Sequence, residues 1–267
     1  MSLEAATKIE IRDLTMAYGS FVVMRDISAE IKRGEIFIIM GGSGCGKSTL
    51  LRHMIGLKQP ARGDVFYDGV SFWNSSEDAR MQKLRTFGVL FQSGALWSSM
   101  TLAENIELVL EEYTGFPPAE THAIARLKLA LVGLRGFEDY YPAEVSGGMS
   151  KRAGLARALA LDPDILFFDE PSAGLDPISS RNLDDLILQL RDTLGATFVV
   201  VTHELASIFT IGDNSVFLDP NTRTMRAQGN PRELLKNSTD PAVQQFLRRG
   251  EYSAKAITPK PMSSGVL

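Results

Sequence analysis

A glycine-rich segment ending in a lysine and a serine carries the clearest chemical signal in this 267-residue sequence. It reads Gly41-Gly42-Ser43-Gly44-Cys45-Gly46-Lys47-Ser48 and matches the phosphate-binding pattern G-x-x-x-x-G-K-[ST]. Glycines let the backbone curl so that successive N–H groups point at phosphate oxygens. We expect Lys47 to reach the β- and γ-phosphates of a nucleotide, the Ser48 hydroxyl to ligate Mg²⁺, and Thr49 to lie beside the same phosphates.

Two adjacent carboxylates, Asp169 and Glu170, stand at the end of an apolar segment later in the chain. An acidic residue at the end of a buried strand loses solvation unless it meets a cation. We therefore expect Asp169 to hold Mg²⁺, directly or through water, and Glu170 to polarise an attacking water as a general base. These residue types predict phosphoryl transfer to water, which depends on positioning and charge neutralisation more than on covalent chemistry.

A second candidate anion site, Ser146-Gly147-Gly148, comes just before a long helical pattern. Ser146 can cap that helix, and the two glycines expose its N-terminal amides. Taken alone, this segment is slightly more typical of an ordinary capped helix than of a binding site. It gains weight only from the other motifs in the same chain.

Three short apolar segments predict the strands that position these residues. Residues 36–40, 165–168 and 198–201 are apolar at every position. Such runs are typical of parallel strands that helices cover on both faces in an α/β fold. Helical patterns follow them at 47–55, 179–194 and 204–211. The sequence therefore predicts a mostly parallel core sheet, with the phosphate loop and the acidic pair at strand ends.

The rest of the chain divides into smaller parts around this core. Looser alternation at 9–14 and 21–31 predicts an N-terminal antiparallel β-subdomain. Residues 98–161 are predicted to form an inserted α-helical subdomain, with helices at 102–111, 119–131 and 148–161. Residues 7–249 are expected to form one domain. Residues 250–267 are rich in Ser, Pro, Lys and Gly and are expected to form an extended tail.

Over roughly residues 7–235 these motifs resemble those of the ATP-binding cassette (ABC) family of P-loop NTPases. The resemblance implies an ABC ATPase fold, ATP and Mg²⁺ as cofactors, and ATP hydrolysis coupled to transport. It identifies Ser146-Gly147-Gly148 with the family's signature motif, which engages the γ-phosphate of the ATP bound to the other subunit. Met149 replaces the glutamine most common there, at a position that varies within the family.

Four further residues match the family in its order of motifs. Gln92 resembles the Q-loop glutamine that touches Mg²⁺ and water, and His203 resembles the switch histidine that contacts the γ-phosphate. Asp176, in Gly174-Leu175-Asp176, resembles the D-loop aspartate, and Tyr18 resembles the aromatic residue that stacks on adenine. Each residue alone says little, but their shared order leaves little room for coincidence. The resemblance implies two head-to-tail copies of the chain with two ATP molecules between them.

Four short segments of the sequence resemble the ATPases of bacterial Mce-associated lipid transporters, which include the maintenance-of-lipid-asymmetry system. They lie at residues 91–97, 100–106, 131–136 and 240–247. This resemblance implies phospholipid transport between inner and outer membranes. The implied partners are an integral-membrane permease, an MCE-domain protein and, in some systems, a STAS-domain protein. It places the chain peripherally at the cytoplasmic face of the bacterial inner membrane, with the segment from Phe246 to Leu267 reaching a partner subunit.

Two other functions are compatible with the generic motifs. One is the ATPase of a small-solute importer, although the run after Gln92 argues against it. The other is a soluble ABC protein acting on ribosomes or DNA. Such chains usually carry two cassettes or a long coiled coil, and neither is visible in this sequence.

The composition argues against some classes of function, and it includes a single cysteine whose reactivity can be tested. A net charge of −4 gives no sign of the basic surface that nucleic-acid binding usually requires. The N-terminus shows no signal peptide, and no apolar run is long enough to span a bilayer. Cys45 is the only cysteine, which suits a reducing compartment. Because it stands among amides beside Lys47, we expect a lowered thiol pKa, so that alkylation blocks ATP binding and nucleotide protects the thiol.

Overall fold

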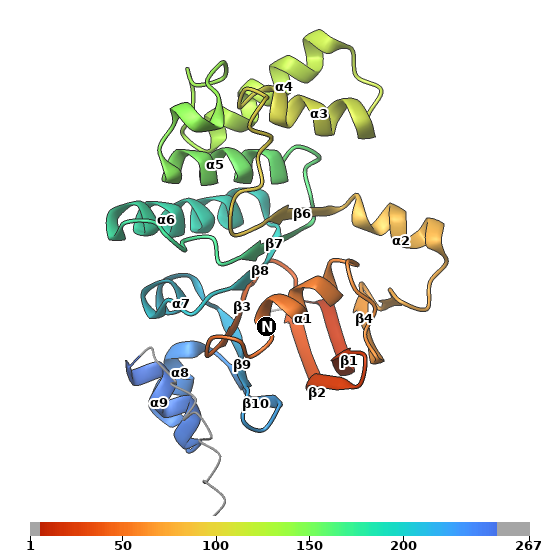
Figure 1. Ribbon diagram of the computed structural model, residues 1–267, viewed down its shortest axis with the longest axis vertical. Helices are drawn as coiled ribbons and strands as arrows, with labels where there is room; N and C mark the ends of the chain where they lie inside the picture. The colour runs from red at the N-terminus through yellow and green to blue at the C-terminus, as the bar shows by residue number, and fades with distance from the viewer. Residues whose placement is uncertain (1–5, 250–267) are drawn as a thin grey trace, which may run out of the picture.

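The computed structural model describes residues 6–249 and places a six-stranded sheet at the centre of the molecule (Figure 1). The strand order is β10–β9–β3–β8–β7–β6. These strands are β3 (Ile36–Gly41), β6 (Phe87–Leu90), β7 (Ile165–Asp169), β8 (Thr197–Val201), β9 (Asn214–Asp219) and β10 (Thr224–Gly229). All neighbouring strands are parallel except β10, which is antiparallel to β9. The predicted mostly parallel core sheet is confirmed.

A smaller antiparallel sheet is formed largely by the first third of the chain. Its order is β2–β1–β4–β5. The strands are β1 (Thr7–Tyr18), β2 (Phe21–Lys32), β4 (Arg62–Tyr67) and β5 (Val70–Ser71). β4 and β5 were not predicted, although the Asp68-Gly69 pair between them is a sequence signal for a hairpin. Such a turn requires positive φ at both residues, and here their φ values are 52° and 78°. The predicted N-terminal antiparallel β-subdomain is confirmed.

Helices cover the six-stranded sheet and form a group at one end of the molecule (Figure 1). They are α1 (Lys47–Met54), α2 (Glu77–Leu84), α3 (Glu104–Tyr113), α4 (Pro118–Leu131), α5 (Gly147–Ala158), α6 (Pro177–Leu194), α7 (Leu205–Ile211), α8 (Pro231–Asn237) and α9 (Pro241–Arg249), with a 3₁₀ turn at Pro142–Glu144. α3, α4 and α5 lie together at the top of Figure 1, and all three fall within the range predicted for the helical subdomain. Within residues 6–249, every helix is too short or too polar to cross a bilayer.

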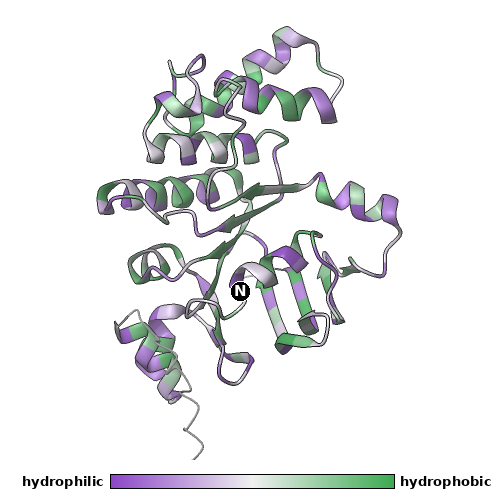
Figure 2. Cartoon of the chain, viewed as in Figure 1, coloured by the Kyte–Doolittle hydropathy of each residue, from purple (hydrophilic) through white to green (hydrophobic). Residues whose placement is uncertain are grey.

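Alternate residues of β3 pack into two different hydrophobic cores. Ile36, Ile38 and Met40 pack with helices on one face of the sheet, whereas Phe37 and Ile39 pack with α1 and the β-subdomain on the other. All five side chains are fully buried, and Figure 2 shows the central strands in the colour of apolar residues. Each buried side chain of this kind contributes about 1.5–3 kcal/mol. The strand that delivers the phosphate loop is therefore held from both sides.

The C-terminal helix α9 belongs to the core of this chain. Phe246 is fully buried and its ring centroid lies 5.2 Å from that of Phe217 on β9. Leu247 is also buried. The expectation that the segment from Phe246 onward reaches a partner subunit is therefore wrong for these two residues, because their side chains are already covered within the chain. Residues 250–267, predicted to form an extended tail, lie outside the described residues.

Candidate nucleotide site

The phosphate loop connects β3 to α1 through a backbone that requires glycine at two positions. Gly46 stands at the N-cap of α1 with φ 94°, in the left-handed region. Gly41 has φ 153°, and a Cβ there would lie 2.5 Å from the carbonyl oxygen of Leu218 on β9. α1 begins at Lys47 as predicted. The N-terminal amides of this helix therefore face the loop, as an anion site requires.

Lys47 is held inside the loop by carbonyl oxygens. Only 7% of the residue is exposed, and its Nζ donates hydrogen bonds to the carbonyl oxygens of Gly41 at 3.1 Å and Gly42 at 3.2 Å. The same Nζ lies 3.8 Å from Oε1 of Glu170. The phosphate-binding lysine and the proposed general base, predicted from separate motifs, are thus brought together.

Ser48 and Asp169 form a second link between the loop and β7. The Ser48 hydroxyl donates a hydrogen bond to Asp169 Oδ1 at 2.8 Å. A hydroxyl and a carboxylate oxygen are the hard donors that Mg²⁺ prefers. No cluster of three or more His, Cys, Asp or Glu suited to a metal occurs within residues 6–249. A cation at this position would therefore complete its shell with phosphate oxygens and water.

Glu170 stands in a backbone conformation that only its surroundings can maintain. Its φ is 50°, which is uncommon for a residue other than glycine and costs of order 1–3 kcal/mol. Its N–H donates to the carbonyl oxygen of Val201, which ties it to the end of β8. Its Oε2 lies 2.8 Å from Nδ1 of His203. The site thus joins the predicted base and the predicted switch histidine, while His203 itself stays 55% exposed.

Two further residues predicted for the site, Tyr18 and Gln92, lie at the end of β1 and on the turn after β6. Tyr18 ends β1 with 47% of its surface exposed, and the Nζ of Lys58 lies 3.2 Å from its ring centroid. A hydrogen bond with Thr49 lowers the pKa of the Tyr18 hydroxyl, so the residue predicted to stack on adenine adjoins the helix that follows the phosphate loop. Gln92 is exposed on the turn after β6. Within residues 6–249, no hydrogen bond joins Gln92 to the phosphate loop.

The signature segment, Ser146-Gly147-Gly148, lies apart from the phosphate loop of its own chain. Ser146 caps α5, where its Oγ accepts a hydrogen bond from the Met149 N–H at 3.2 Å. Figure 1 shows α5 within the upper group of helices, with strands between it and α1. Asp176 likewise caps α6, accepting from the N–H groups of Ile178 and Ser179 at 3.0 Å each. Those hydrogen bonds, above all the contact with Ser179, lower the pKa of the exposed Asp176 carboxyl.

The expected reactivity of Cys45 is wrong. Its side chain is 1% exposed and packs in the core beneath the loop. Burial raises the pKa of the Cys45 thiol and outweighs the nearby charge of Lys47, which acts in the opposite direction. The sequence suggested a thiol activated by amides and Lys47, but the side chain points into the hydrophobic core.

We expect alkylation of Cys45 to be at least about tenfold slower in the folded protein than in denaturant, with or without ATP, because burial and a raised thiol pKa both reduce its reactivity. Mass spectrometry of iodoacetamide-treated samples measures both rates. Equal rates in buffer and denaturant would contradict the buried position.

Arg157 on α5 is a contact that the sequence did not reveal. Its guanidinium donates to the carbonyl oxygens of Ala95 at 2.6 Å and Gly94 at 3.1 Å. Both carbonyls belong to the turn that follows Gln92. Helix α5, which begins just after Ser146, is therefore attached to the turn that follows Gln92 in the same chain. No sequence pattern signals this, because the contact depends on how α5 packs against β6.

A buried carboxyl, Asp184, lies on α6 where that helix contacts α7. It is 4% exposed and accepts a hydrogen bond from the hydroxyl of Ser207 at 2.8 Å. Burial raises the pKa of Asp184 to about 6, the charges of Glu204 and Asp185 add to the rise, and the Ser207 hydrogen bond opposes it. The folded protein therefore binds this proton more tightly than the unfolded chain, and stability falls as the pH rises from about 4 to about 6.

We expect Asp184→Asn to raise the free energy of unfolding at pH 7.5 by at most about 3 kcal/mol, and to change it little near pH 4. The amide removes the buried charge while its oxygen still accepts from Ser207. Chemical denaturation at the two pH values measures the difference, and Asp185→Asn, on the exposed face of the same helix, is the control. An equal effect of Asp184→Asn at both pH values would contradict the raised pKa.

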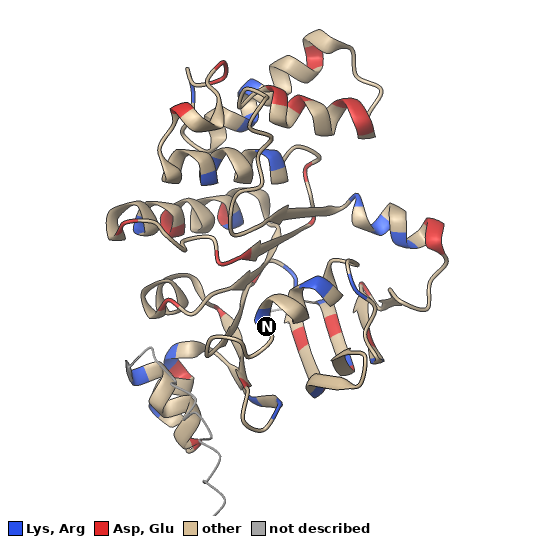
Figure 3. Ribbon diagram, in the orientation of Figure 1, with Lys and Arg blue, Asp and Glu red and all other residues tan. Residues whose placement is uncertain are grey.

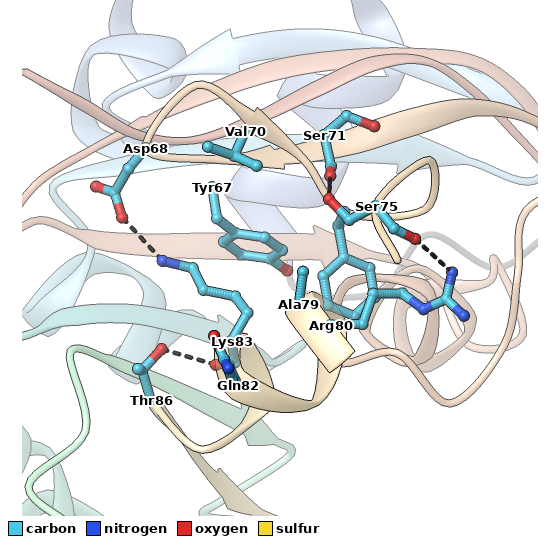
Figure 4. Close-up of a pocket in the computed structure, with 11 residues that line it drawn as sticks. Tyr67, Asp68, Val70, Ser71, Ser75, Ala79, Arg80, Gln82, Lys83 and Thr86 are labelled. Carbon is cyan, nitrogen blue, oxygen red and sulfur yellow. Dashed lines mark hydrogen bonds and ion pairs between the residues drawn. The ribbon is translucent and has the colours of Figure 1, made fainter. Parts of the chain in front are cut away.

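A separate cavity of about 300 Å³ lies between the β4–β5 hairpin and α2 (Figure 4). At its edge Asp68 accepts hydrogen bonds from Lys83 on α2 and Lys8 on β1, both at 2.9 Å, and from Arg33 at 2.7 Å. Partial burial raises the pKa of Asp68, but the contacts with Lys83 and Lys8 outweigh it and lower the pKa. Figure 3 shows the acidic start and basic end of α2, an orientation that suits the helix dipole. This cluster attaches α2 to the β-subdomain, and none of its residues was predicted.

Comparison with known proteins gives a consistent result. The profile of the ABC transporter family matches residues 24–173. The intermembrane phospholipid transport system ATP-binding protein MlaF of Escherichia coli is 39% identical over 247 residues, which cover 92% of this chain and 91% of that protein. The probable ribonucleotide transport ATP-binding protein mkl of Mycobacterium tuberculosis is 43% identical over 239 residues. That alignment covers 90% of this chain and 66% of the mycobacterial protein.

Solved structures share the fold. A dimeric post-hydrolysis state of the ATP-binding cassette MJ0796, bound to ADP and phosphate, matches with a TM-score of 0.75 and 29% identity, covering 83% of this chain and 98% of the other. CbiO1 from Clostridium perfringens, part of the cbiONQ transporter complex, matches with a TM-score of 0.79 and 26% identity. That match covers 91% of this chain and 95% of CbiO1.

Proposed function

This chain belongs to the ABC transporter family and is an ATPase, and from that premise we propose that it drives phospholipid transport between the inner and outer membranes of a bacterium. The observation that carries the proposal is the 39% identity to the E. coli phospholipid transport protein, which extends over 92% and 91% of the two chains. The run of residues 91–97 after β6 supports the same assignment.

In the proposed reaction, one subunit supplies the groups around the γ-phosphate. Lys47 neutralises phosphate charge, and Ser48 and Asp169 would hold Mg²⁺, which supplies further charge neutralisation when bound. Glu170 accepts a proton from the attacking water, and His203, 2.8 Å from its carboxylate, orients it. Gln92, exposed on the turn after β6, is proposed to approach the Mg²⁺ and the attacking water.

A second copy of the chain completes the site. The signature segment lies apart from its own phosphate loop, so Ser146 and Gly148 are proposed to bind the γ-phosphate held by the partner, with Asp176 at the seam. The dimeric MJ0796 structures support a pair of copies, and we propose that the two copies are arranged head to tail. ATP then favours the closed dimer because only that state contacts both halves, and hydrolysis lets it reopen.

The permease is proposed to dock in a groove beside Gln92. A cavity of about 470 Å³ is lined by α2, β6, α3 and α5, including Phe91, Tyr113 and Arg157. Arg157 also binds the turn after Gln92, so a segment seated here touches both the Q-loop and the signature helix. We propose further that the chain lies peripherally at the cytoplasmic face of the inner membrane and works with an MCE-domain protein and, as in some such systems, a STAS-domain protein.

A second candidate is transport of a small solute, favoured by the mycobacterial relative named for ribonucleotide transport. That alignment spans 66% of the relative's length, whereas the phospholipid transport relative is matched over 91% of its own. Phospholipid is therefore the preferred cargo class.

Purification of the tagged full-length chain from detergent-solubilised membranes tests the proposal. We expect an integral-membrane permease and an MCE-domain protein to co-purify, with phospholipid enriched over a mock purification. A permease accompanied by a soluble substrate-binding protein, without phospholipid enrichment, would instead establish the solute importer. Ribosomal or DNA-bound partners would overturn both candidates.

A further inference from the structure

Lys151 is a buried lysine whose ammonium binds the backbone of the catalytic loop, residues 170–176. It lies on α5, five positions after Ser146, and is 8% exposed. Its Nζ donates a hydrogen bond to the carbonyl oxygen of Ala173 at 2.6 Å and lies 3.5 Å from that of Glu170. These carbonyls belong to the turn that carries the general base.

This use of a buried ammonium is unusual because no carboxylate neutralises it. Among residues 6–249, Lys151 forms no ion pair within 4.0 Å. Desolvation lowers the pKa of its ammonium, while the more distant charges of Glu204 and Glu170 oppose that effect. A buried charge without a partner is costly, so its hydrogen bonds to the loop offset a substantial penalty.

The turn that Lys151 binds is one that needs outside support. Glu170 has φ 50°, and its carbonyl oxygen already accepts the N–H of Ala173 at 3.1 Å. A strained backbone keeps one conformation only where several contacts fix it. The carbonyl oxygen of Val201 on β8 accepts the Glu170 N–H, and Lys151 on α5 donates to the carbonyl oxygen of Ala173.

We propose that Lys151 is a positioning residue that links the signature segment to the Glu170 general base of the same subunit and thereby couples the two ATP sites of the dimer. The inference rests on the two-copy arrangement proposed above. In that arrangement Ser146 touches the ATP on the partner's phosphate loop, whereas Glu170 acts on the ATP of its own loop. α5 is a continuous helix, so a shift of its start on binding one ATP moves Lys151 and the turn that positions the base for the other.

The test compares Lys151→Met, which keeps side-chain length but removes the ammonium, with Lys151→Arg and with Lys128→Met in the full-length chain. Lys128 is the matched control, because it is also a buried lysine of the helical subdomain but pairs with Asp162, away from the site. For Lys151→Met we expect kcat to fall about tenfold or more, since a charge-assisted hydrogen bond is lost. We also expect the Hill coefficient for ATP to fall to about 1 with an unchanged Kd for fluorescent nucleotide. Lys151→Arg should restore part of both.

Each outcome separates the alternatives. Unchanged kcat and Hill coefficient in Lys151→Met, equal losses in Lys128→Met, or weakened nucleotide binding would overturn the coupling role. Lys151→Met combined with Glu170→Gln should still form an ATP-dependent dimer on gel filtration, which shows that the variant folds and pairs. If Glu170→Gln alone forms no such dimer, the two-copy arrangement itself fails, independently of Lys151. Absence of phospholipid in the co-purification leaves the Lys151 result unaffected.

Discussion

Glu170→Gln should bind ATP with near-normal affinity, lose turnover by about 10²- to 10⁴-fold, and accumulate as a closed dimer. The glutamine amide keeps the shape of the side chain but cannot accept a proton from water. It also removes the negative charge 3.8 Å from Lys47, which leaves that lysine freer to engage phosphate. Phosphate release measures turnover, and gel filtration with and without ATP measures the dimer.

Glu77→Gln, the same change on the exposed first turn of α2, is the control and should leave both properties unaltered. Turnover near that of the wild type in Glu170→Gln would show that another group accepts the proton. His203→Ala separates the contribution of His203 from that of Glu170. It removes the 2.8 Å contact that orients the Glu170 carboxylate but leaves that carboxylate in place as the base. Its loss of turnover should therefore be smaller than that of Glu170→Gln.

Asp169→Asn should reduce Mg²⁺-dependent ATP hydrolysis by at least about a hundredfold. The carboxylate stands at the end of β7 and accepts the Ser48 hydroxyl at 2.8 Å, so two oxygen donors are already in place for the cation. An amide keeps one oxygen but removes the charge that attracts a divalent ion. Titration of activity with Mg²⁺ measures the effect, which should include a higher half-maximal Mg²⁺ concentration.

Asp139→Asn provides the corresponding exposed control in the helical subdomain, and its Mg²⁺ titration should match that of the wild type. If Asp169→Asn hydrolysed ATP normally at low Mg²⁺, the proposed cation position between Ser48 and Asp169 would be incorrect. Nucleotide binding without Mg²⁺ should be little changed, which distinguishes loss of the cation from loss of the phosphate loop.

The sequence predicted those parts of the site that depend on local pattern. The apolar runs before Gly41 and Asp169 could be identified because strands buried on both faces have few alternatives. The glycines at 41 and 46 signalled the loop because a Cβ at Gly41 would lie 2.5 Å from the Leu218 carbonyl oxygen and Gly46 has a φ of 94°. The parallel order of these strands then brought Lys47, Glu170 and His203 together.

What the sequence could not predict are contacts made by packing between distant segments. The burial of the Cys45 side chain could not be predicted, because the direction in which a loop side chain points depends on the core beneath it. Here Leu218 on β9 completes that core. Lys151 and Arg157 look like ordinary helix-surface charges, and only the packing of α5 against the turn after Glu170 and the turn after Gln92 reveals their contacts. Asp184 shows no motif because its environment comes from two helices.

The position of β3 in the sheet has a consequence for the order in which the protein is made. β3 hydrogen-bonds to β8 on one side and β9 on the other, so its neighbours end only at Asp219. The phosphate loop emerges from the ribosome early, whereas the flanking strands β8 and β9 emerge only after residues 197–219 have been translated. The nascent loop therefore lacks its two flanking strands until Asp219 has been translated, and nucleotide can serve as a folding ligand only after that point.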